Sequence, residues 1–320
     1  MEKQEYTVKV VTPTIMGGAN GKLDSNFIRT AEIKSAMRQA FRLVAGKYID
    51  HNQKEHDREE GIKLLYDLES EVFGNTEGKG KFRLIVDPND IKEDDIKEVK
   101  LLPHRENSPK KQAIMPGSKF KLQIISYNKY PIEFYKALLD IAFLLGVGFK
   151  RNRLFGNMKI EQSESFDFGK SVEKIENFLK EKGLEERFAE NPLFACLSKR
   201  SNGDKEEDKN YLIKSVDLKD GYSVDKEFEN MLKDLYEKII QEIEKEKKEK
   251  FNVILGSAKP RQSSYVNFSI LEEPSGYKFY IFSFYYKNKD FDYGNWRKAT
   301  EKVEKLVKET FEKNKVRVER

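Results

Sequence analysis

The sequence predicts an α+β fold built from two tandem ferredoxin-like modules with insertions. Two observations lead to this prediction. The chain has 320 residues, about twice the length of an ordinary domain. The apolar patterns of its first half follow the order strand, helix, strand, strand, helix, strand, which is the βαββαβ order of a ferredoxin-like module. The second half repeats this outline loosely, so we expect one module over residues 1–163 and a second over residues 164–320.

The first strand and the first helix flank a glycine-rich loop. Residues 4–11 alternate as in a strand, and Pro13 and the glycines up to Gly21 interrupt the pattern. Thr30 then stands where the N-cap of a helix is expected. After it, apolar residues recur at the spacing of one helical face, and the helix is predicted to end near Gly46. The residues of this face are Ile33, Ala36, Met37, Ala40, Phe41 and Val44.

A long insertion is predicted between the second and third strands of the first module. A second helical pattern runs from Ile62 to Val72 and leads through a turn to the strand Phe82–Val86. Residues 87–117 carry many charges and four prolines, and they show no sustained period. We therefore expect this segment to be a long loop or a partly disordered insertion.

The first module ends with a strand, a buried helix and a second glycine-rich loop. The strand covers Phe120–Ser126, and Pro131 opens the helix Ile132–Leu145. Because nearly every side chain of this helix is apolar, we expect it to lie inside the protein rather than at its surface. The loop GVGFKRNRLFG then leads into the last strand.

The second module is outlined less completely. An amphipathic helix over residues 171–182 is expected to connect the two halves. The further elements that we predict are a short strand at Leu193–Leu197, a long helix over residues 228–243, strands at Tyr265–Leu271 and Tyr277–Tyr286, a helix over residues 294–313 and a weak final strand at residues 316–318. Aromatic residues occupy both faces of the strand that begins at Tyr277. Packing in the core is the preferred interpretation, and stacking of RNA bases is the alternative.

Composition limits the classes of function. Lys and Arg number 60 and Asp and Glu 55, so the net charge of +5 does not by itself indicate nucleic-acid binding. The single cysteine, Cys196, excludes an internal disulfide. Because the whole chain contains only this cysteine and three histidines, we expect no metal site, and we also expect no cofactor. No stretch is apolar enough for a signal peptide or a membrane-spanning helix, so we expect a cytoplasmic protein without a membrane partner.

Positive charge is concentrated on the first helix, next to the first glycine-rich loop. Lys34, Arg38 and Arg42 are spaced by four residues and form a basic ridge away from the apolar face. A solvated helix face would show the same pattern. The ridge, however, follows a loop that contains Gly17 and Gly18, where a phosphate backbone can approach closely and main-chain amides can bind it. This position favours RNA binding.

Three more basic turns fit the same chemistry. They are the second glycine-rich loop, the turn FGNTEGKGKFR with Lys79 and Lys81, and the turn GSAKPRQSS with Lys259 and Arg261. Lys150, Arg151 and Arg153 crowd the second glycine-rich loop, where they repel one another unless a polyanion is bound. This loop lacks the Gly-Lys-Ser/Thr ending of a P-loop. A plain hairpin turn would explain any single turn, but four in one chain indicate an RNA-binding surface. The residues predicted to bind RNA are Gly17, Gly18, Lys34, Arg38, Arg42, Lys79, Lys81, Lys150, Arg151, Arg153, Lys259 and Arg261.

The stretch TPTIMGGANGKLDSNFIRTAEIKSAMRQAFR resembles the opening of the RAMP superfamily, in particular its two-module head subunit of the type III-B CRISPR (Cmr) effector complex. FGNTEGKGKFRL, GVGFKRNRLFGN and AKPRQSS are similar to further signatures of that family in the same order. The resemblance implies two ferredoxin-like modules without a nuclease centre, placed near the 3′ end of the guide RNA beside other RAMP subunits. It also implies that the basic ridge and the cations of the second glycine-rich loop line the RNA path.

These observations lead to one preferred function and two alternatives. We expect the chain to hold guide RNA, or its duplex with target RNA, through phosphate and 2′-hydroxyl contacts and without cutting it. The first alternative is a metal-independent endoribonuclease that processes CRISPR transcripts with His51, His56 or His104 as general acid or base. The second is a protein scaffold that has no RNA affinity of its own.

Overall fold

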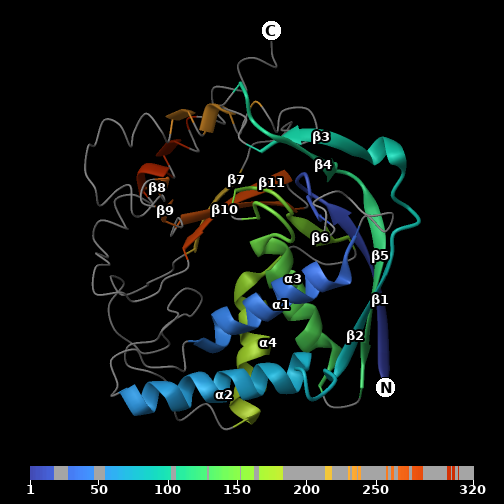
Figure 1. Ribbon diagram of the computed structural model, residues 1–320, viewed down its shortest axis with the longest axis vertical. Coiled ribbons are helices and arrows are strands. Elements are labelled where there is room, and N and C mark those ends of the chain that lie inside the picture. The colour runs from blue at the N-terminus through green and yellow to red at the C-terminus, as the bar shows by residue number, and fades with distance from the viewer. Residues whose placement is uncertain are drawn as a thin grey trace.

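In the described part of the chain, the two larger sheets are antiparallel and a helical layer packs against both. The computed structural model describes residues 1–17, 28–46, 55–101, 106–127, 130–151, 153–161, 166–182 and 213–217, and short segments between residues 230 and 309. Figure 1 shows the larger sheet along one side of the helices and the smaller sheet across one end of them. Apolar residues of both sheets and of the helices form one shared core.

The larger sheet has the strand order of a ferredoxin-like module. Its strands are β1 (Glu2–Val10), β2 (Phe82–Asp87), β5 (Lys119–Ser126) and β6 (Met158–Ile160), and they lie in the order β2-β5-β1-β6. Every neighbouring pair is antiparallel. In this arrangement β1 and β2 are parallel with β5 between them, and β5 and β6 are parallel with β1 between them. Each parallel pair is connected in the chain by a helical crossover. The βαββαβ prediction for the first half is confirmed.

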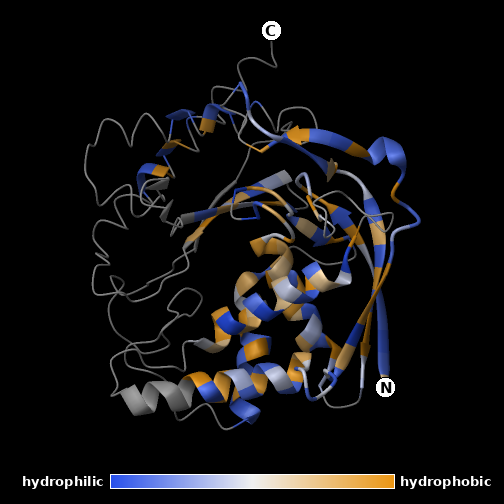
Figure 2. Ribbon diagram, in the orientation of Figure 1, coloured by the Kyte–Doolittle hydropathy of each residue, from blue (hydrophilic) through white to orange (hydrophobic). Residues whose placement is uncertain are grey.

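Two helices cover one face of this sheet. They are α1 (Thr30–Ala45) and α3 (Ile132–Leu145), which pack against each other and against the strands. The predicted apolar face of α1 is buried throughout. Figure 2 shows α3 as one of the most hydrophobic parts of the molecule, as expected for an interior helix. The prediction of Thr30 as N-cap was wrong by one residue, because the carbonyl of Arg29 already accepts the first helical hydrogen bonds.

The insertion between β2 and β5 is a β-hairpin, so the prediction of a loop was wrong. The hairpin consists of β3 (Ile96–Lys100) and β4 (Lys110–Ile114), which pair antiparallel. Ile114 also exchanges main-chain hydrogen bonds of 2.8 and 2.9 Å with Thr14, so the hairpin is anchored to the first glycine-rich loop. Its strands escaped prediction because they contain few apolar residues, and Figure 2 shows the hairpin and the turn before it as largely hydrophilic.

Two further helices pack beside α1 and α3. The helix α2 (Glu55–Phe73) contains the predicted pattern from Ile62 to Val72 and contacts α1. The predicted connecting helix is α4 (Phe168–Glu181), which packs on α3. Asp167 is its N-cap, because the Asp167 carboxylate accepts a hydrogen bond from the main-chain N–H of Lys170. None of the helices within the described residues is long and apolar enough to cross a membrane.

The smaller sheet repeats part of the first one. Its strands are β7 (Ile213–Asp217), β10 (Val266–Glu273) and β11 (Gly276–Ser283), in the order β10-β11-β7 and antiparallel throughout. When β7, β10 and β11 are taken as the counterparts of β1, β2 and β5, the order β10-β11-β7 matches the order β2-β5-β1 of the larger sheet. The strand β7 was missed because it contains only two apolar residues.

The aromatic strand β11 belongs to the core, at least along its described part. Phe279, Tyr280, Ile281 and Phe282 are all buried, although they alternate between the two faces of the sheet. The preferred interpretation is therefore confirmed for these residues. Two further short strands are described in the second half, β8 (Ser257–Ala258) and β9 (Arg261–Gln262), which pair with each other. The predicted elements at Leu193–Leu197 and 316–318, and most of those at 228–243 and 294–313, lie outside the described residues.

Candidate nucleic-acid interface

The two glycine-rich loops of the first half lie against each other. The main-chain N–H of Phe149 donates to the carbonyl of Ile15 at 2.9 Å, and that of Gly156 donates to the carbonyl of Pro13 at 3.1 Å. Within the second loop, the N–H of Val147 donates to the carbonyl of Gly156 at 2.8 Å. Residues 12–16 are buried, and their hydrogen bonds to residues 149 and 156 give the second loop a fixed support. The sequence predicted both loops but not their contact.

Glycine is required in the second loop by this contact between two stretches of main chain. Gly148 has a φ of +89°, and a Cβ atom added there would lie 2.3 Å from the carbonyl oxygen of Ile15. Gly156 has a φ of +78°, and its added Cβ would lie 2.0 Å from the carbonyl oxygen of Val147. A side chain at either position would combine an unfavourable backbone conformation with a clash. These glycines therefore fix the shape in which the loop presents its cations.

Four basic residues lie in or next to the segments where the second loop contacts the first loop and α1 begins. Lys150 has a φ of +60°, and the N–H of Arg153 donates to its carbonyl at 2.8 Å, which closes a tight turn. Arg29 donates from Nη1 to the carbonyl of Gly17 at 2.6 Å. We call Arg29, Lys150, Arg151 and Arg153, together with the main chain at Gly17, the loop cluster. Sequence reasoning missed Arg29, although its place just before the first helix pointed to it.

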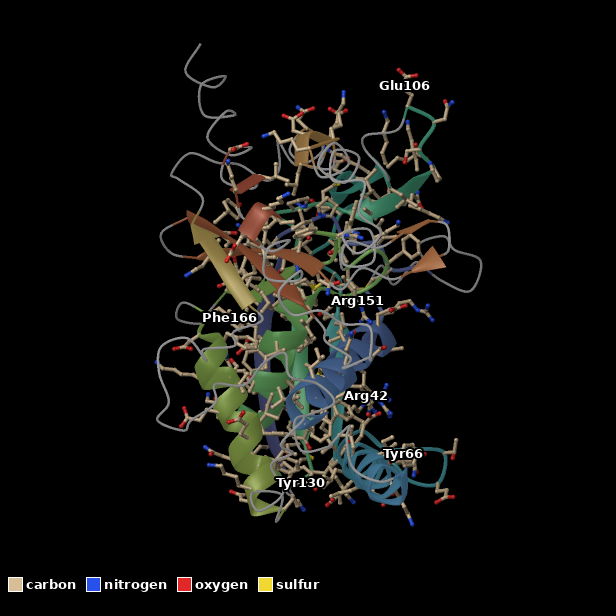
Figure 3. All side chains as sticks on the ribbon, turned by 90° about the vertical axis from the view of Figure 1, so that its left-hand side faces the viewer. Arg42, Tyr66, Glu106, Tyr130, Arg151 and Phe166 are labelled. Atoms are coloured by element: carbon tan, nitrogen blue, oxygen red, sulfur yellow. The ribbon has the colours of Figure 1, made fainter. Side chains whose placement is uncertain are left out.

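Arg151 is a partly buried cation of the loop cluster. Burial lowers the pKa of its guanidinium group, and the charge of Glu32 in the first turn of α1 acts in the opposite direction. Figure 3 shows Arg151 near one end of α1, with Arg42 farther along the same helix. A cation that has lost part of its hydration gains from the approach of a further anion, so the loop cluster is suited to bind a phosphate group.

The basic ridge on α1 faces α2 rather than solvent alone. Arg38 donates from Nη1 to Glu69 Oε1 at 2.9 Å, and Arg42 donates from Nη2 to the same oxygen at 2.8 Å and from Nε to Oε2. The Glu69 side chain is only 4% exposed, whereas those of Arg38 and Arg42 are 33% and 54% exposed. Two of the three ridge residues thus hold α2 against α1. The sequence hid this partner because Glu69 lies 27 and 31 residues away.

Lys34 and the turn after α2 complete this second basic region. The ammonium group of Lys34 lies 5.4 Å from the centre of the Phe82 ring, and burial, followed by the charge of Arg38, lowers its pKa. Lys79 is exposed and Lys81 is half-buried on the turn that joins α2 to β2. Arg38 reaches this turn by donating from Nη2 to the carbonyl of Gly74 at 2.6 Å. The predicted residues therefore form two groups, which α1 connects.

A double-mutant cycle on Glu69 and Arg38 tests the structural role of the ridge. We expect Glu69→Gln and Arg38→Gln each to lower the free energy of unfolding by about 1–3 kcal/mol, because Arg38→Gln leaves the buried Glu69 carboxylate incompletely bonded and Glu69→Gln removes the charge that two guanidinium groups share. The coupling energy between the two changes should be about 1 kcal/mol or more, measured by urea unfolding. The exposed pair Lys174 and Glu133 serves as control, with an expected coupling below about 0.5 kcal/mol. A coupling no larger than the control would show that the contact does not secure α2.

A buried asparagine joins the loop cluster to the second sheet. Asn157 donates from Nδ2 to the carbonyl of Leu144 at 2.9 Å and to Ser269 Oγ at 2.8 Å. Its Oδ1 accepts the main-chain N–H of Ile270 at 3.3 Å, and its own N–H donates to Thr12 Oγ1 at 2.9 Å. One side chain thus links the first loop, the end of α3 and β10. Sequence reasoning missed it, because only its polarity within an apolar stretch distinguishes it.

Ion pairs and a strand contact reinforce the same junction. Glu272 on β10 lies 2.7 Å from the ammonium group of Lys9 on β1 and 3.2 Å from that of Lys159 on β6. Burial raises the pKa of Glu272, but the two ammonium groups outweigh burial, so its pKa is lowered overall. Arg153 forms a parallel β-bridge with Phe268 on β10. The loop cluster therefore lies where the two halves of the chain meet.

Several predicted residues cannot be assigned to either basic group. Gly18 and Lys259 lie outside the described residues, and so does the side chain of Arg261, whose main chain belongs to β9. The same holds for His51, His104 and the side chain of His56, on which the nuclease alternative depends. Within the described part of the chain, no group of three or more His, Cys, Asp or Glu side chains could hold a metal ion.

Comparisons with known proteins indicate what this chain is similar to. The RAMP superfamily model matches residues 7–159, which include the end of β1, α1 and both glycine-rich loops. The CRISPR system Cmr subunit Cmr1-1 of Pyrococcus furiosus is 30% identical over 151 residues, which are 43% of this chain and 42% of that relative. The alignment with this relative thus spans less than half of either protein.

Two solved structures have a similar fold over nearly the whole chain. The crystal structure of Cmr1 from Pyrococcus furiosus in its apo form gives a TM-score of 0.58 at 19% identity, covering 92% of this chain and 93% of that one. A chain of the type III-B Cmr-beta complex, bound to cognate target RNA and AMPPnP in the presence of single-stranded DNA, gives a TM-score of 0.53 at 15% identity, covering 95% and 99%. Residues 7–159 are therefore similar to the RAMP superfamily, and the fold of the chain is similar to that of the solved structure of Cmr1 from Pyrococcus furiosus.

Proposed function

We propose that this chain is a non-catalytic subunit of a type III-B CRISPR effector ribonucleoprotein and holds its guide RNA near the 3′ end, alone or paired with target RNA. The observation that carries this proposal is the loop cluster, in which four basic residues lie on or next to two loops that are joined by main-chain hydrogen bonds. The similar proteins support it, since they are named as Cmr subunits and one comes from a complex with target RNA. Its partners would be RNA and other RAMP subunits.

The geometry suits contacts with a phosphate backbone rather than with particular bases. Guanidinium and ammonium groups form charge-assisted hydrogen bonds to phosphate oxygens without reading sequence. Because the supporting loops are joined by main-chain hydrogen bonds, little order has to be gained when RNA binds. A clamp of this kind would hold guide RNAs of any sequence, which an effector complex requires.

The two basic groups would contribute unequally to the RNA path. We assign the first contacts to Lys150, Arg151 and Arg153, because the folded loop holds them together. Arg42 would extend the path, since about half of its side chain remains exposed, whereas Lys34 and Arg38 mainly secure the helices and the turn that bears Lys79 and Lys81. From Glu32 to Arg42, ten residues of α1 span about 15 Å.

The strand orders also support the proposed modules, residues 1–163 and 164–320. In the first half the four strands have the complete ferredoxin-like order, and in the second the three described strands have the order of the first three. The helix α4 then belongs to the start of the second module while it packs on α3 of the first.

RNA binding by the purified chain, measured at several salt concentrations with a chelator present, tests the proposed function. We expect the affinity to fall steeply with salt, by a slope of about 0.7 for each phosphate contact to single-stranded RNA, and the RNA to remain intact on a gel. Cleavage at a fixed position would replace the proposal by the processing nuclease. In that case a variant with alanine at His51, His56 and His104 should lose the activity. If the chain bound no RNA at any salt concentration, a scaffold would be the remaining interpretation.

A further inference from the structure

Phe149, in the second glycine-rich loop, is exposed although the other large apolar side chains of that loop are buried. Phe149 is 51% exposed, whereas Val147, Leu154 and Phe155 in the same loop are buried almost completely. The loop therefore has an apolar underside, and Phe149 is turned away from it. A single exposed apolar side chain is common on protein surfaces, so the meaning of this one depends on the main chain that carries it and on the groups around it.

The main chain holds Phe149 in this outward position. Its N–H donates to the carbonyl of Ile15 at 2.9 Å. Before it stands Gly148, packed directly on the Ile15 carbonyl, and after it stands Lys150 in the left-handed conformation. Both neighbours and the hydrogen bond constrain the backbone at Phe149, and with it the direction in which the side chain leaves the main chain. A ring carried on a constrained main chain loses less freedom when a ligand covers it than a ring on an unconstrained loop would lose.

The chemistry around the ring indicates what would cover it. Lys150, Arg151 and Arg153 follow within four residues and are the proposed phosphate contacts. In single-stranded RNA each phosphate has a base next to it, and aromatic rings stack on bases of any sequence. In a duplex the bases are stacked on each other and cannot reach such a ring. The combination of an exposed ring and adjacent cations is therefore suited to a nucleotide whose base is unpaired.

We propose that Phe149 is a stacking platform for one unpaired RNA base, so that the loop cluster binds RNA that is single-stranded at this point. This inference rests on the proposed function and makes it more specific, because it selects single-stranded RNA over the guide-target duplex at this position. A protein partner that covers Phe149 is the competing explanation for its exposure, and the experiment below distinguishes the two.

The test compares Phe149→Ala, Phe149→Leu and Phe149→Tyr with the unchanged chain, using single-stranded RNA and a blunt duplex of the same sequence. For the single strand we expect Phe149→Ala to weaken binding about 5- to 100-fold, because one stacking contact is lost. Phe149→Tyr should restore binding and Phe149→Leu should not. The salt slope should stay unchanged, since no phosphate contact is removed. Binding of the duplex should not change.

Tyr127 provides a matched control, because it is similarly exposed but lies at the end of β5 outside the loop cluster. Tyr127→Ala should leave both affinities unchanged. If the chain binds RNA but Phe149→Ala has no effect, or if Phe149→Leu binds as well as the unchanged chain, stacking is rejected while the proposed function stands. If the unchanged chain binds no RNA, the proposed function fails and the inference fails with it.

Discussion

Replacing Arg151 and Arg153 together by alanine is expected to weaken RNA binding by a factor of about 100 or more. Each guanidinium group that hydrogen-bonds to a phosphate contributes roughly 1.5–3 kcal/mol, and about 1.4 kcal/mol corresponds to a factor of ten in affinity. The slope of log affinity against log salt should fall by about 1.4, or 0.7 for each lost contact to single-stranded RNA. Fluorescence anisotropy with labelled RNA at several salt concentrations measures both quantities.

Two sets of variants make this result specific. Arg151→Lys with Arg153→Lys keeps both charges but loses the forked donor geometry, so we expect it to retain most of the salt slope and to recover the affinity in part. Alanine at Lys63 and Lys170, both exposed on other helices, removes the same charge elsewhere and should change the affinity less than threefold. An alanine variant of Arg151 and Arg153 that folds normally and keeps the full slope would show that the loop cluster does not contact RNA.

Replacing Asn157 by alanine should lower the free energy of unfolding by about 3 kcal/mol or more. The change removes hydrogen bonds to Leu144, Ser269 and Ile270, and it leaves the buried N–H of Ile270 without the acceptor that it has now. Unsatisfied buried groups of this kind cost about 1–3 kcal/mol each, and effects within one network add up to the largest values seen for point mutations. Urea unfolding followed by circular dichroism gives the difference.

A milder change keeps this prediction testable if the alanine variant fails to fold. Ser269→Ala removes one partner of Asn157 and leaves its bond to the Leu144 carbonyl, so a loss of about 1 kcal/mol is expected. Asn89→Ala replaces an exposed amide and should stay within about 0.5 kcal/mol of the unchanged chain. If Asn157→Ala were as stable as Asn89→Ala, the buried amide would not hold the two sheets together.

Apolar periodicity was sufficient to predict the first module. The stripe from Ile33 to Val44 is buried in α1 as expected, and the apolar helix Ile132–Leu145 is the interior helix α3. Both patterns are reliable because burial of one helical face leaves a period in the sequence. The hairpin of β3 and β4 leaves no such period, since most of its side chains face away from the core.

The contacts of the candidate site could not be predicted, because they join residues far apart in the chain. Spacing by four correctly put Lys34, Arg38 and Arg42 on one face of α1, but it could not reveal Glu69 on the next helix. In the same way, glycines and cations marked the loop at 146–156, but its bonds to residues 13–15 depend on the folded sheet. Sequence therefore located the charges, and the structure added the contacts by which Arg38 and Arg42 hold two helices together and by which the loop at 146–156 is supported.

The link between Asn157 and β10 also limits how this chain can change during evolution. A repeat that buries only its own residues can be duplicated, exchanged or lost without harm to its neighbour. Here the amide of Asn157 in the first half has two of its partners, Ser269 and Ile270, in the second half. The halves are therefore expected to have lost their independence as folding units, and substitutions on β10 to be accepted only when they suit the loop that follows α3. A chain truncated after residue 163 is therefore expected to express less well than the full chain and to be selected against.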